Sequence, residues 1–495
     1  MRRPLTGAAA LLLAGAALAT PSPTDASVPS LDRAPVHRVR ATPVPTSWGP
    51  TRGEVRRAHE LVDDMSLAEQ AGQVIVAGYH GTGSPAALIA RLHLGGAVPV
   101  AENITSSTQI RAVNASIQRV VRGRGYPAFI GVDQEGGTVV RIRDAATAFP
   151  TFMSTGAARD PALTRRTSAA NGREMRGLGF TSVLAPVADV TRGPADPVIG
   201  TRSASGFPPI AAAQVVAAQA GLADAGVIGA LKHFPGHGSV TVDSHQALPV
   251  LRTPLRELMR TALVPFRRGI DAGASAVMIG HLDVRAVDPH VPASLSRKVV
   301  TGLLRRELGF QGVVMTDALS MGAIVHRYGS AKAAARAVNA GVDIVLMPAD
   351  ARAARTGIVD AVRAGRLPRA RLEAAATRMV ALLLHEDHAR VAPARLGSSA
   401  ALSAQLSAEA LTSVAGPCSG RLVGGHVRVS GPEPAVSAFR AMALAHGLVL
   451  GRGTRVSLAS SGRPARAGVL VALDRPELLA DSSAPVRVAT YGATP

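Results

Sequence analysis

Eight short apolar segments recur along the chain, and each is followed by a longer stretch rich in Ala, Leu and Arg with helical spacing. The apolar segments lie at residues 73–79, 95–100, 127–133, 182–190, 227–233, 276–282, 312–317 and 341–347. Continuous apolar strands that alternate with helices are typical of a parallel sheet covered by helices. Eight such units predict an α/β fold with a (β/α)8 barrel of the TIM type. An open, doubly wound sheet is the alternative.

Polar side chains stand at the carboxyl ends of several of these segments. They are Asp133, Asp189, Lys232 with His233, His281 with Asp283, and Asp317. In a (β/α)8 barrel these ends open onto one face, where the active sites of such barrels lie. We therefore expect a functional site there. Asp189 and Asp283 can also be explained as residues that cap helices or hold loops.

The rest of the chain divides into recognisable parts. Arg2 and Arg3 precede an apolar run that ends in small residues, which predicts an export signal over residues 1–19. Residues 20–50 are rich in Pro, Ser and Thr and predict a linker. We expect the barrel at 51–390 and a small α/β region, short enough to be a truncated domain, at 391–495. The mature protein is expected to be secreted or associated with the cell wall, with no membrane span and no lipid anchor.

The net charge of +20 raises the question of a nucleic-acid partner. The basic residues are scattered without a run of five or six, and aromatic residues make up only 3 % of the chain. Such a sequence lacks both the clustered basic footprint and the stacking surfaces that nucleic-acid binding needs. We therefore expect no nucleic-acid partner, and a monomer is the expected state.

The segment LKHFPGHGSVTVDSHQALP, residues 231–249, holds three histidines, a lysine and an aspartate. A zinc site is disfavoured because Pro235, Gly236 and Gly238 interrupt the usual ligand spacings. A phosphate-binding loop is disfavoured because the GxxxxGK[ST] order is absent. We expect no metal and no cofactor here, and general acid/base chemistry is the interpretation that remains.

Asp243 and His245 have the spacing that this chemistry needs. Residues two apart in an extended segment point to the same side, so the carboxylate can orient the imidazole. A histidine held in this way can donate and accept protons near neutral pH. Lys232, one of three lysines in the chain, lies beside this loop and can contact a substrate hydroxyl. His237, between two glycines, is expected to brace the loop.

Five motifs resemble those of glycoside hydrolase family 3, and within it the bacterial β-N-acetylglucosaminidase branch. They are GVDQEGG at 131–137, DPVIGTRS at 196–203, KHFPGHG at 232–238, DSH at 243–245 and VVMTDALSMGAI at 313–324. The resemblance extends over residues 55–385, with the motifs in the family's order.

This resemblance implies a (β/α)8 barrel that hydrolyses terminal β-linked N-acetylglucosamine from peptidoglycan fragments, with retention of configuration and without a metal. By matched position, Asp317 is the nucleophile, His245 the acid/base and Asp243 its partner. The positions that hold the sugar are matched by Asp133, Arg202, Lys232 and His233. Most retaining glycosidases use two carboxylates, so a histidine in the acid/base role is a departure that this branch shares.

The chain departs from the branch at two positions near Arg202. Thr201 stands where Asp is common and Ala204 where Phe is common, so we expect Arg202 to be held less firmly. Three alternative functions stay open. They are a β-glucosidase of the same family, a glycosyl phosphorylase that transfers the sugar to phosphate, and a non-catalytic barrel that binds cell-wall sugars.

Overall fold

The computed structural model describes residues 46–417, 420–461, 467–473, 476–480 and 482–491. The expected export signal (1–19) and most of the expected linker (20–50) therefore lie outside the described residues. Within the described residues, no helix has the length and the apolar character that crossing a membrane would require.

All eight expected strands are present and form one parallel sheet. They are β1 (Ile75–Ala77), β2 (Gly96–Ala97), β3 (Phe129–Val132), β4 (Ser182–Val183), β5 (Ile228–Phe234), β7 (Ala276–Ile279), β9 (Val313–Thr316) and β10 (Val345–Leu346). Their order in the sheet is β10-β1-β2-β3-β4-β5-β7-β9, and every pairing is parallel. A parallel bridge from Met315 of β9 to Ile344, directly before β10, joins the two ends. The barrel prediction is confirmed, and the open-sheet alternative is wrong.

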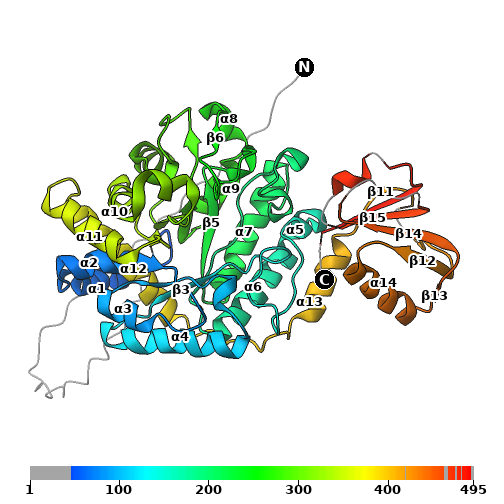
Figure 1. The fold of residues 1–495 in the computed structure, drawn as a ribbon, viewed down its shortest axis with the longest axis horizontal. Coiled ribbons are helices and arrows are strands. Elements are labelled where there is room, and N and C mark those ends of the chain that lie inside the picture. Colours follow the sequence, from blue (N-terminus) through cyan, green and yellow to red (C-terminus); the bar gives the residue numbers. More distant parts are fainter. Residues whose placement is uncertain (1–45, 418–419, 462–466, 474–475, 481, 492–495) are drawn as a thin grey trace, which may run out of the picture. The chain divides into compact units, whose positions relative to one another are not determined.

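Helices surround the strands (Figure 1). Those that precede or follow the strands are α1 (Arg52–Asp63), α2 (Leu67–Gln73), α3 (Ala86–Leu92), α4 (Ser107–Val121), α5 (Met153–Ala158), α6 (Pro161–Gly177), α7 (Pro208–Asp224), α8 (Leu255–Arg260), α9 (Val264–Asp271), a π-helix (Lys298–Glu307), α10 (Gly322–Ala340), α11 (Ala351–Arg363) and α12 (Arg369–His388). The sequence sets several starts, because Ser106, Asp160 and Asp350 each accept a hydrogen bond from a backbone N–H in the first turn that follows. At Gly329 α10 is kinked, with φ of 64°, a conformation that favours glycine.

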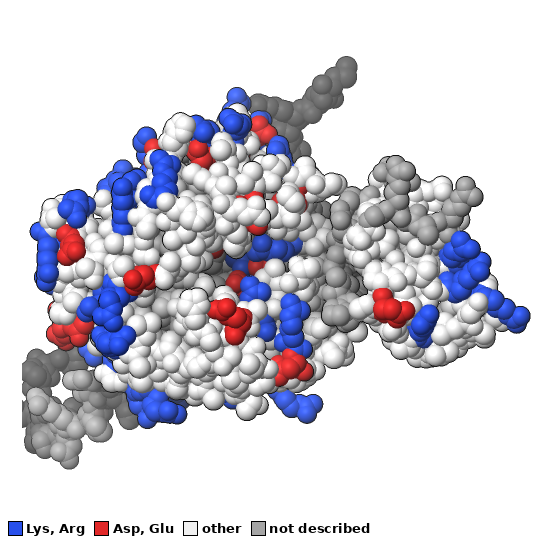
Figure 2. Space-filling view, in the orientation of Figure 1, with Lys and Arg blue, Asp and Glu red and all other residues white. Residues whose placement is uncertain are grey.

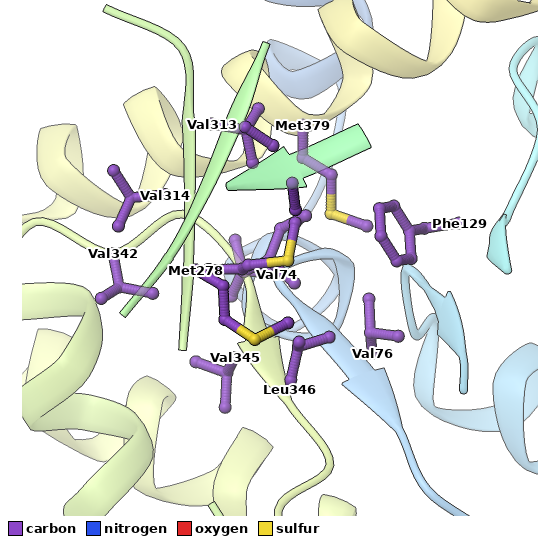
Figure 3. Close-up of a cluster of buried hydrophobic side chains, with 14 of the residues drawn as sticks. Val74, Val76, Phe129, Met278, Val313, Val314, Val342, Val345, Leu346 and Met379 are labelled. Carbon is purple, nitrogen blue, oxygen red and sulfur yellow. The ribbon is translucent and has the colours of Figure 1, made fainter. Parts of the chain in front are cut away.

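Apolar side chains from the strands fill the barrel (Figure 3). Val76, Phe129, Met278 and Val313 come from four different strands and are all nearly or fully buried. Met379 of α12 reaches into the same cluster, beside Phe129 in this view. The interior is therefore a packed core, which leaves the carboxyl ends of the strands as the place for a site.

Asp343, two residues before β10, is a fully buried charge that ties the barrel to two surrounding helices. Its carboxylate pairs with Arg305 of the π-helix and with Arg371 and Arg378 of α12, and it accepts a hydrogen bond from the Val314 N–H at 3.0 Å. Burial alone would raise the pKa of Asp343, but the three guanidinium groups hold it below its ordinary value.

The C-terminal part forms a second, six-stranded sheet with the order β11-β16-β15-β14-β12-β13. Its strands are β11 (Thr412–Ala415), β12 (His426–Ser430), β13 (Val449–Leu450), β14 (Thr454–Ala459), β15 (Val469–Leu473) and β16 (Val486–Thr490). All pairings are parallel except that of β11 with β16. With the helices α13 (Ala400–Glu409) and α14 (Glu433–Ala445), this part has the expected α/β character.

The first prediction concerns the buried charge at Asp343. Asp343→Ala leaves three guanidinium groups without their shared partner, and loss of one side of a buried ion pair costs about 3–5 kcal/mol. We expect a matching decrease in the free energy of unfolding of the barrel, measured by urea denaturation. The control is Glu60→Ala, which removes the exposed pair of Glu60 with Arg57 and should cost less than about 1 kcal/mol. Equal effects of the two changes would contradict this account.

Candidate active site

A pocket of about 360 Å3 opens at the carboxyl ends of the barrel strands. Its lining includes six of the seven site residues expected from the sequence, which are Asp133, Arg202, Lys232, His233, His245 and Asp317. The seventh, Asp243, contacts His245 at 2.7 Å. The fold thus brings together residues that are as far apart in sequence as Asp133 and Asp317.

Lys232, near the end of β5, has a nearly fully buried side chain at the centre of an ionic network. Its Nζ atom donates to Asp133 Oδ1 at 2.8 Å and lies 2.6 Å from Glu135 Oε1. Burial alone would lower the pKa of Lys232, but the two carboxylates outweigh it and the pKa is raised. The lysine is therefore charged, and its position is fixed.

Arg202 is bound to the same network through Glu135. Its Nε and Nη2 atoms donate to the two oxygens of Glu135 at 2.9 and 2.8 Å. Burial would raise the pKa of Glu135, but the charges of Arg202 and Lys232 lower it well below its ordinary value. The expectation that Thr201 and Ala204 leave Arg202 less firmly held is wrong, because Glu135 holds the guanidinium by a bidentate pair.

Glu135 is the residue of this network that the sequence analysis missed. It lies in the same GVDQEGG motif as Asp133. A lysine expected at a buried strand end needs counter-charges, so a second acidic residue near Asp133 was the signal that could have identified it. Arg141, 3.5 Å from Asp133 and also in the pocket lining, was missed as well.

Asp189, beyond the end of β4, is fully buried and holds two histidines. Its Oδ2 atom lies 2.7 Å from Nδ1 of His233, and its Oδ1 atom accepts from the backbone N–H of His237 at 2.6 Å. Burial opposes its ionisation, but His233 and His237 lower the pKa of Asp189. Because Asp189 is ionised, Nδ1 of His233 carries a hydrogen and Nε2 is left for the pocket. Asp189 thus holds the loop that carries His237, which agrees with the explanation of Asp189 as a residue that holds a loop.

Asp243 and His245 are in contact, but the expected extended geometry is wrong. Residues 244–246 form a turn, in which Asp243 Oδ1 accepts from the backbone N–H of His245 at 2.9 Å and lies 2.7 Å from its Nδ1 atom. A short side chain that bonds to the backbone two residues later is typical of aspartate in turns. Burial opposes ionisation of Asp243, but these hydrogen bonds lower its pKa. The His245 ring remains exposed, at 71 %.

Two contacts attach this loop to the barrel. The Nε2 atom of His237 lies 2.9 Å from the hydroxyl of Ser244, so His237 braces the loop as expected. At the start of α10, the N–H of Gly322 donates to the His245 carbonyl at 3.2 Å. The helix that follows Asp317 thus also supports the segment that carries His245.

Asp317 lies directly after β9 and is partly buried. Its backbone N–H donates to the Ile279 carbonyl at 2.9 Å, and its Oδ1 atom accepts from the N–H of Ala318 at 2.7 Å. Burial would raise the pKa of Asp317, but His233, His281 and the Ala318 N–H bring it below its ordinary value. An ionised carboxylate in a fixed position thus lines the pocket.

Two further histidine and aspartate positions from the strand ends have structural partners. His281 bonds Ser294 at 2.8 Å and the Ala318 carbonyl at 2.9 Å, and its burial lowers its pKa. Asp283 pairs with Arg285 at 3.1 Å and accepts from the His290 N–H at 2.8 Å.

In the described part of the chain, no three His, Cys, Asp or Glu residues are grouped so that they could hold a metal ion.

The fold and the pocket define a (β/α)8-barrel enzyme whose site joins fixed carboxylates, imidazoles and cations, a set suited to a hydroxyl-rich ligand. Residues 66–382 match the family model described as the glycosyl hydrolase family 3 N terminal domain. The chain belongs to glycosyl hydrolase family 3 and is a glycoside hydrolase.

Two relatives and one solved structure illustrate the similarity. The chain is 38 % identical over 279 residues to beta-hexosaminidase A of Pseudoalteromonas piscicida, covering 53 % of this chain and 47 % of that protein. It is 34 % identical over 388 residues to beta-hexosaminidase LpqI of Mycobacterium tuberculosis, covering 76 % and 95 %. The structure of a glycoside hydrolase family 3 beta-N-acetylglucosaminidase from Paenibacillus sp. str. FPU-7 aligns with a TM-score of 0.74 and 28 % identity, covering 87 % of this chain and 94 % of that one.

The second prediction tests the support of the His245 loop by α10. A Cβ atom at Gly322 would lie 2.7 Å from the His245 carbonyl oxygen and 2.9 Å from that of Gln246. Gly322→Ala must therefore displace the loop, and we expect a decrease in glycosidase kcat of about tenfold or more, as small misplacements of reacting groups cause. Gly53→Ala is the matched control, since Gly53 also lies in a first helical turn but a Cβ atom there would meet only Thr51 Oγ1, at an ordinary contact distance of 3.8 Å. Unchanged kcat in Gly322→Ala would contradict this account.

Proposed function

We infer that the chain is an exported, retaining exo-β-N-acetylglucosaminidase that removes terminal β-linked N-acetylglucosamine from peptidoglycan fragments. The observation that carries the proposal is that one pocket holds a fixed, ionised Asp317 and an exposed His245 on a loop, beside the network of Asp133, Arg202 and Lys232. The beta-hexosaminidase names of the relatives support the choice of sugar.

In the first step the Asp317 carboxylate attacks the anomeric carbon, and the bond from that carbon to the leaving oxygen breaks. His245, in its protonated form, gives its proton to this oxygen, so an alcohol leaves and a glycosyl ester of Asp317 remains. In the second step the now neutral His245 takes a proton from water while the water oxygen attacks the anomeric carbon. The ester bond breaks, Asp317 is restored, and the sugar is released with its original configuration.

The other site residues bind and orient in this scheme. Lys232 and Asp133 hold sugar hydroxyls, and Arg202 belongs to the same ionic network through Glu135. His233 contacts Asp189 through its Nδ1 atom, so its Nε2 atom is the one that can contact the sugar. Asp243 fixes the ring of His245 through its Nδ1 atom, which leaves Nε2 for the proton transfer.

The domain boundaries proposed here are an export signal at 1–19, a linker at 20–50, a catalytic barrel at 51–390 and a C-terminal α/β region at 391–495. Export places the enzyme outside the cytoplasm, where peptidoglycan fragments arise. The proposed reaction requires no metal and no cofactor.

The experiment that tests the function compares two aryl β-glycosides that differ only in the 2-acetamido group, each with and without phosphate. We expect a strong preference for the N-acetylglucosaminide and free sugar as the product in both buffers. A preference for the glucoside would favour the β-glucosidase alternative, and sugar 1-phosphate would favour the phosphorylase. No turnover of either compound or of a muropeptide would leave the sugar-binding barrel as the function.

The third prediction identifies the nucleophile. Asp317→Ala should decrease kcat by a factor on the order of 10³ or more, because the glycosyl ester cannot form, and a 5-fluoro glycosyl donor should label Asp317 of the unchanged enzyme. The control is Asp271→Ala, which removes an exposed carboxylate outside the pocket. Mass spectrometry of peptides locates the label. A label on another residue, or an oxazoline product formed by the acetamido group of the substrate, would contradict the assignment.

The fourth prediction follows from the lowered pKa of Asp317. The nucleophile must be ionised, so activity is present above this pKa and is lost as pH falls through it. The acidic limb of kcat/KM should therefore lie below the ordinary aspartate pKa of about 3.9. Circular dichroism at each pH separates this limb from acid unfolding. A limb above that value in fully folded enzyme would show that Asp317 is not the group that sets it.

The fifth prediction concerns His245. A nitrophenolate can leave without a proton, whereas a sugar alkoxide cannot, so His245→Ala should decrease the rate of the first step by about 10²–10⁴ for a disaccharide and far less for an activated aryl glycoside. Asp243→Asn should show the same pattern in weaker form. His446→Ala removes another exposed histidine and serves as the control. If both leaving groups suffer equally in His245→Ala, the proton donor is a different residue.

A further inference from the structure

A second cleft, separate from the active-site pocket, lies between α10 and α11 on the outside of the barrel. Its volume is about 690 Å3, which is within the usual range for small-molecule sites. Small residues line it from both helices, among them Ala331, Ala335, Gly357 and Ala361. Gly357 allows the close approach, because a Cβ atom there would lie 2.4 Å from the Ala331 carbonyl oxygen.

Four basic side chains surround this cleft. Arg297 comes from the segment before the π-helix, Lys332 and Arg336 from α10, and Arg366 from the turn after α11. Figure 2 shows Lys and Arg side chains close together on the part of the surface where Figure 1 labels α10 and α11. One acidic residue, Asp360, also lines the cleft, so the local charge is strongly positive.

These cations differ from the arginines of the neighbouring barrel core. Arg305, Arg371 and Arg378 share the carboxylate of Asp343. Arg297, Lys332, Arg336 and Arg366, by contrast, form no ion pair with any acidic residue in the described ranges of the chain. Apart from Asp360, which lines the same cleft without forming an ion pair with them, their charge is balanced by solvent and salt.

Two of the cations are also close neighbours on one helix. Lys332 and Arg336 are four residues apart on α10, a spacing at which like charges repel. Both lie near the ring of Tyr328, with the Lys332 Nζ atom 5.9 Å and the Arg336 Cζ atom 5.1 Å from its centroid. The Arg327 Cζ atom lies over the same ring, 5.4 Å from its centroid. The aromatic face attracts these cations without supplying a negative charge.

We propose that this cleft is a binding site for a ligand that carries two or more phosphate groups. Guanidinium groups match the oxygens of phosphate in pairs of hydrogen bonds, and an ammonium group adds a compact charge. Because the four cations come from three separate segments, they can contact successive phosphates of one ligand. The small residues between the helices leave room for it.

The test uses tripolyphosphate as the probe and isothermal titration calorimetry of the full chain at low ionic strength. We expect one site, and binding at least about tenfold weaker in the double variant Lys332→Ala, Arg336→Ala. The control is Arg111→Ala with Arg119→Ala, which removes two exposed arginines of α4 and should change affinity less than about twofold. Equal losses in the two double variants, or no binding to the unchanged protein, would overturn the proposal.

Three further measurements make the assignment specific. Inorganic phosphate should bind at least about tenfold more weakly than tripolyphosphate, and a tricarboxylate of similar charge should also bind more weakly. Equal binding of either would overturn the assignment to a ligand with several phosphates. Saturating tripolyphosphate should leave turnover of an aryl glycoside unchanged, since competitive inhibition would place the probe in the active site. If the α10 variant unfolds, Arg297→Ala with Arg366→Ala repeats the test.

Discussion

The positive charge of Lys232 is the constraint on which the candidate active site depends. An ammonium group at the end of β5 that is nearly removed from water costs several kcal/mol unless it is neutralised, and Asp133 and Glu135 from the end of β3 both contact it. Glu135 has a second oxygen to satisfy, and that oxygen holds Arg202 from the loop after β4. Charge balance around one lysine therefore fixes three separate segments relative to one another, and the pocket is what remains between them.

The two groups proposed for the chemistry are held in opposite ways. Asp317 follows a strand directly and is bonded through both its backbone and its carboxylate, which suits a nucleophile that must stay under one carbon atom. His245 lies in a turn, and its ring is exposed. This turn is held by the contact of Ser244 with His237 and by the hydrogen bond from Gly322 to the His245 carbonyl. Such a loop can approach the leaving oxygen in one step and admit water in the next. The two buried histidines are held more firmly. His233 contacts the carboxylate of Asp189, and His281 contacts both Ser294 and the Ala318 carbonyl. They contribute to the shape and the charge of the site.

The sequence predicted the fold well because the barrel depends on a repeated local pattern, and each apolar segment became a strand. The segment 182–190 shows the limit, since only Ser182 and Val183 form β4; Leu184, Val187 and Ala188 are also buried but lie outside the strand. The site was predicted as a set of residues, but not as a set of contacts. Glu135 was missed. Arg202 was expected to be held less firmly but forms a bidentate pair with Glu135, and Asp243 reaches His245 through a turn. The first two contacts depend on which side chains from distant segments meet in the fold, and the third depends on one backbone turn. The spacing of residues along the chain shows neither the meeting of distant side chains nor the turn.

The central claim is that the sugar is transferred in two displacements, first to Asp317 and then to water. The most direct test is to follow the first turnovers of an aryl β-N-acetylglucosaminide by proton NMR and to identify the anomer of N-acetylglucosamine that appears before mutarotation. Two displacements at one carbon restore the original configuration, so the account predicts that the β-anomer is formed first. If the α-anomer is formed first, the reaction is a single displacement, Asp317 does not form a glycosyl ester, and the proposed roles of Asp317 and His245 are wrong.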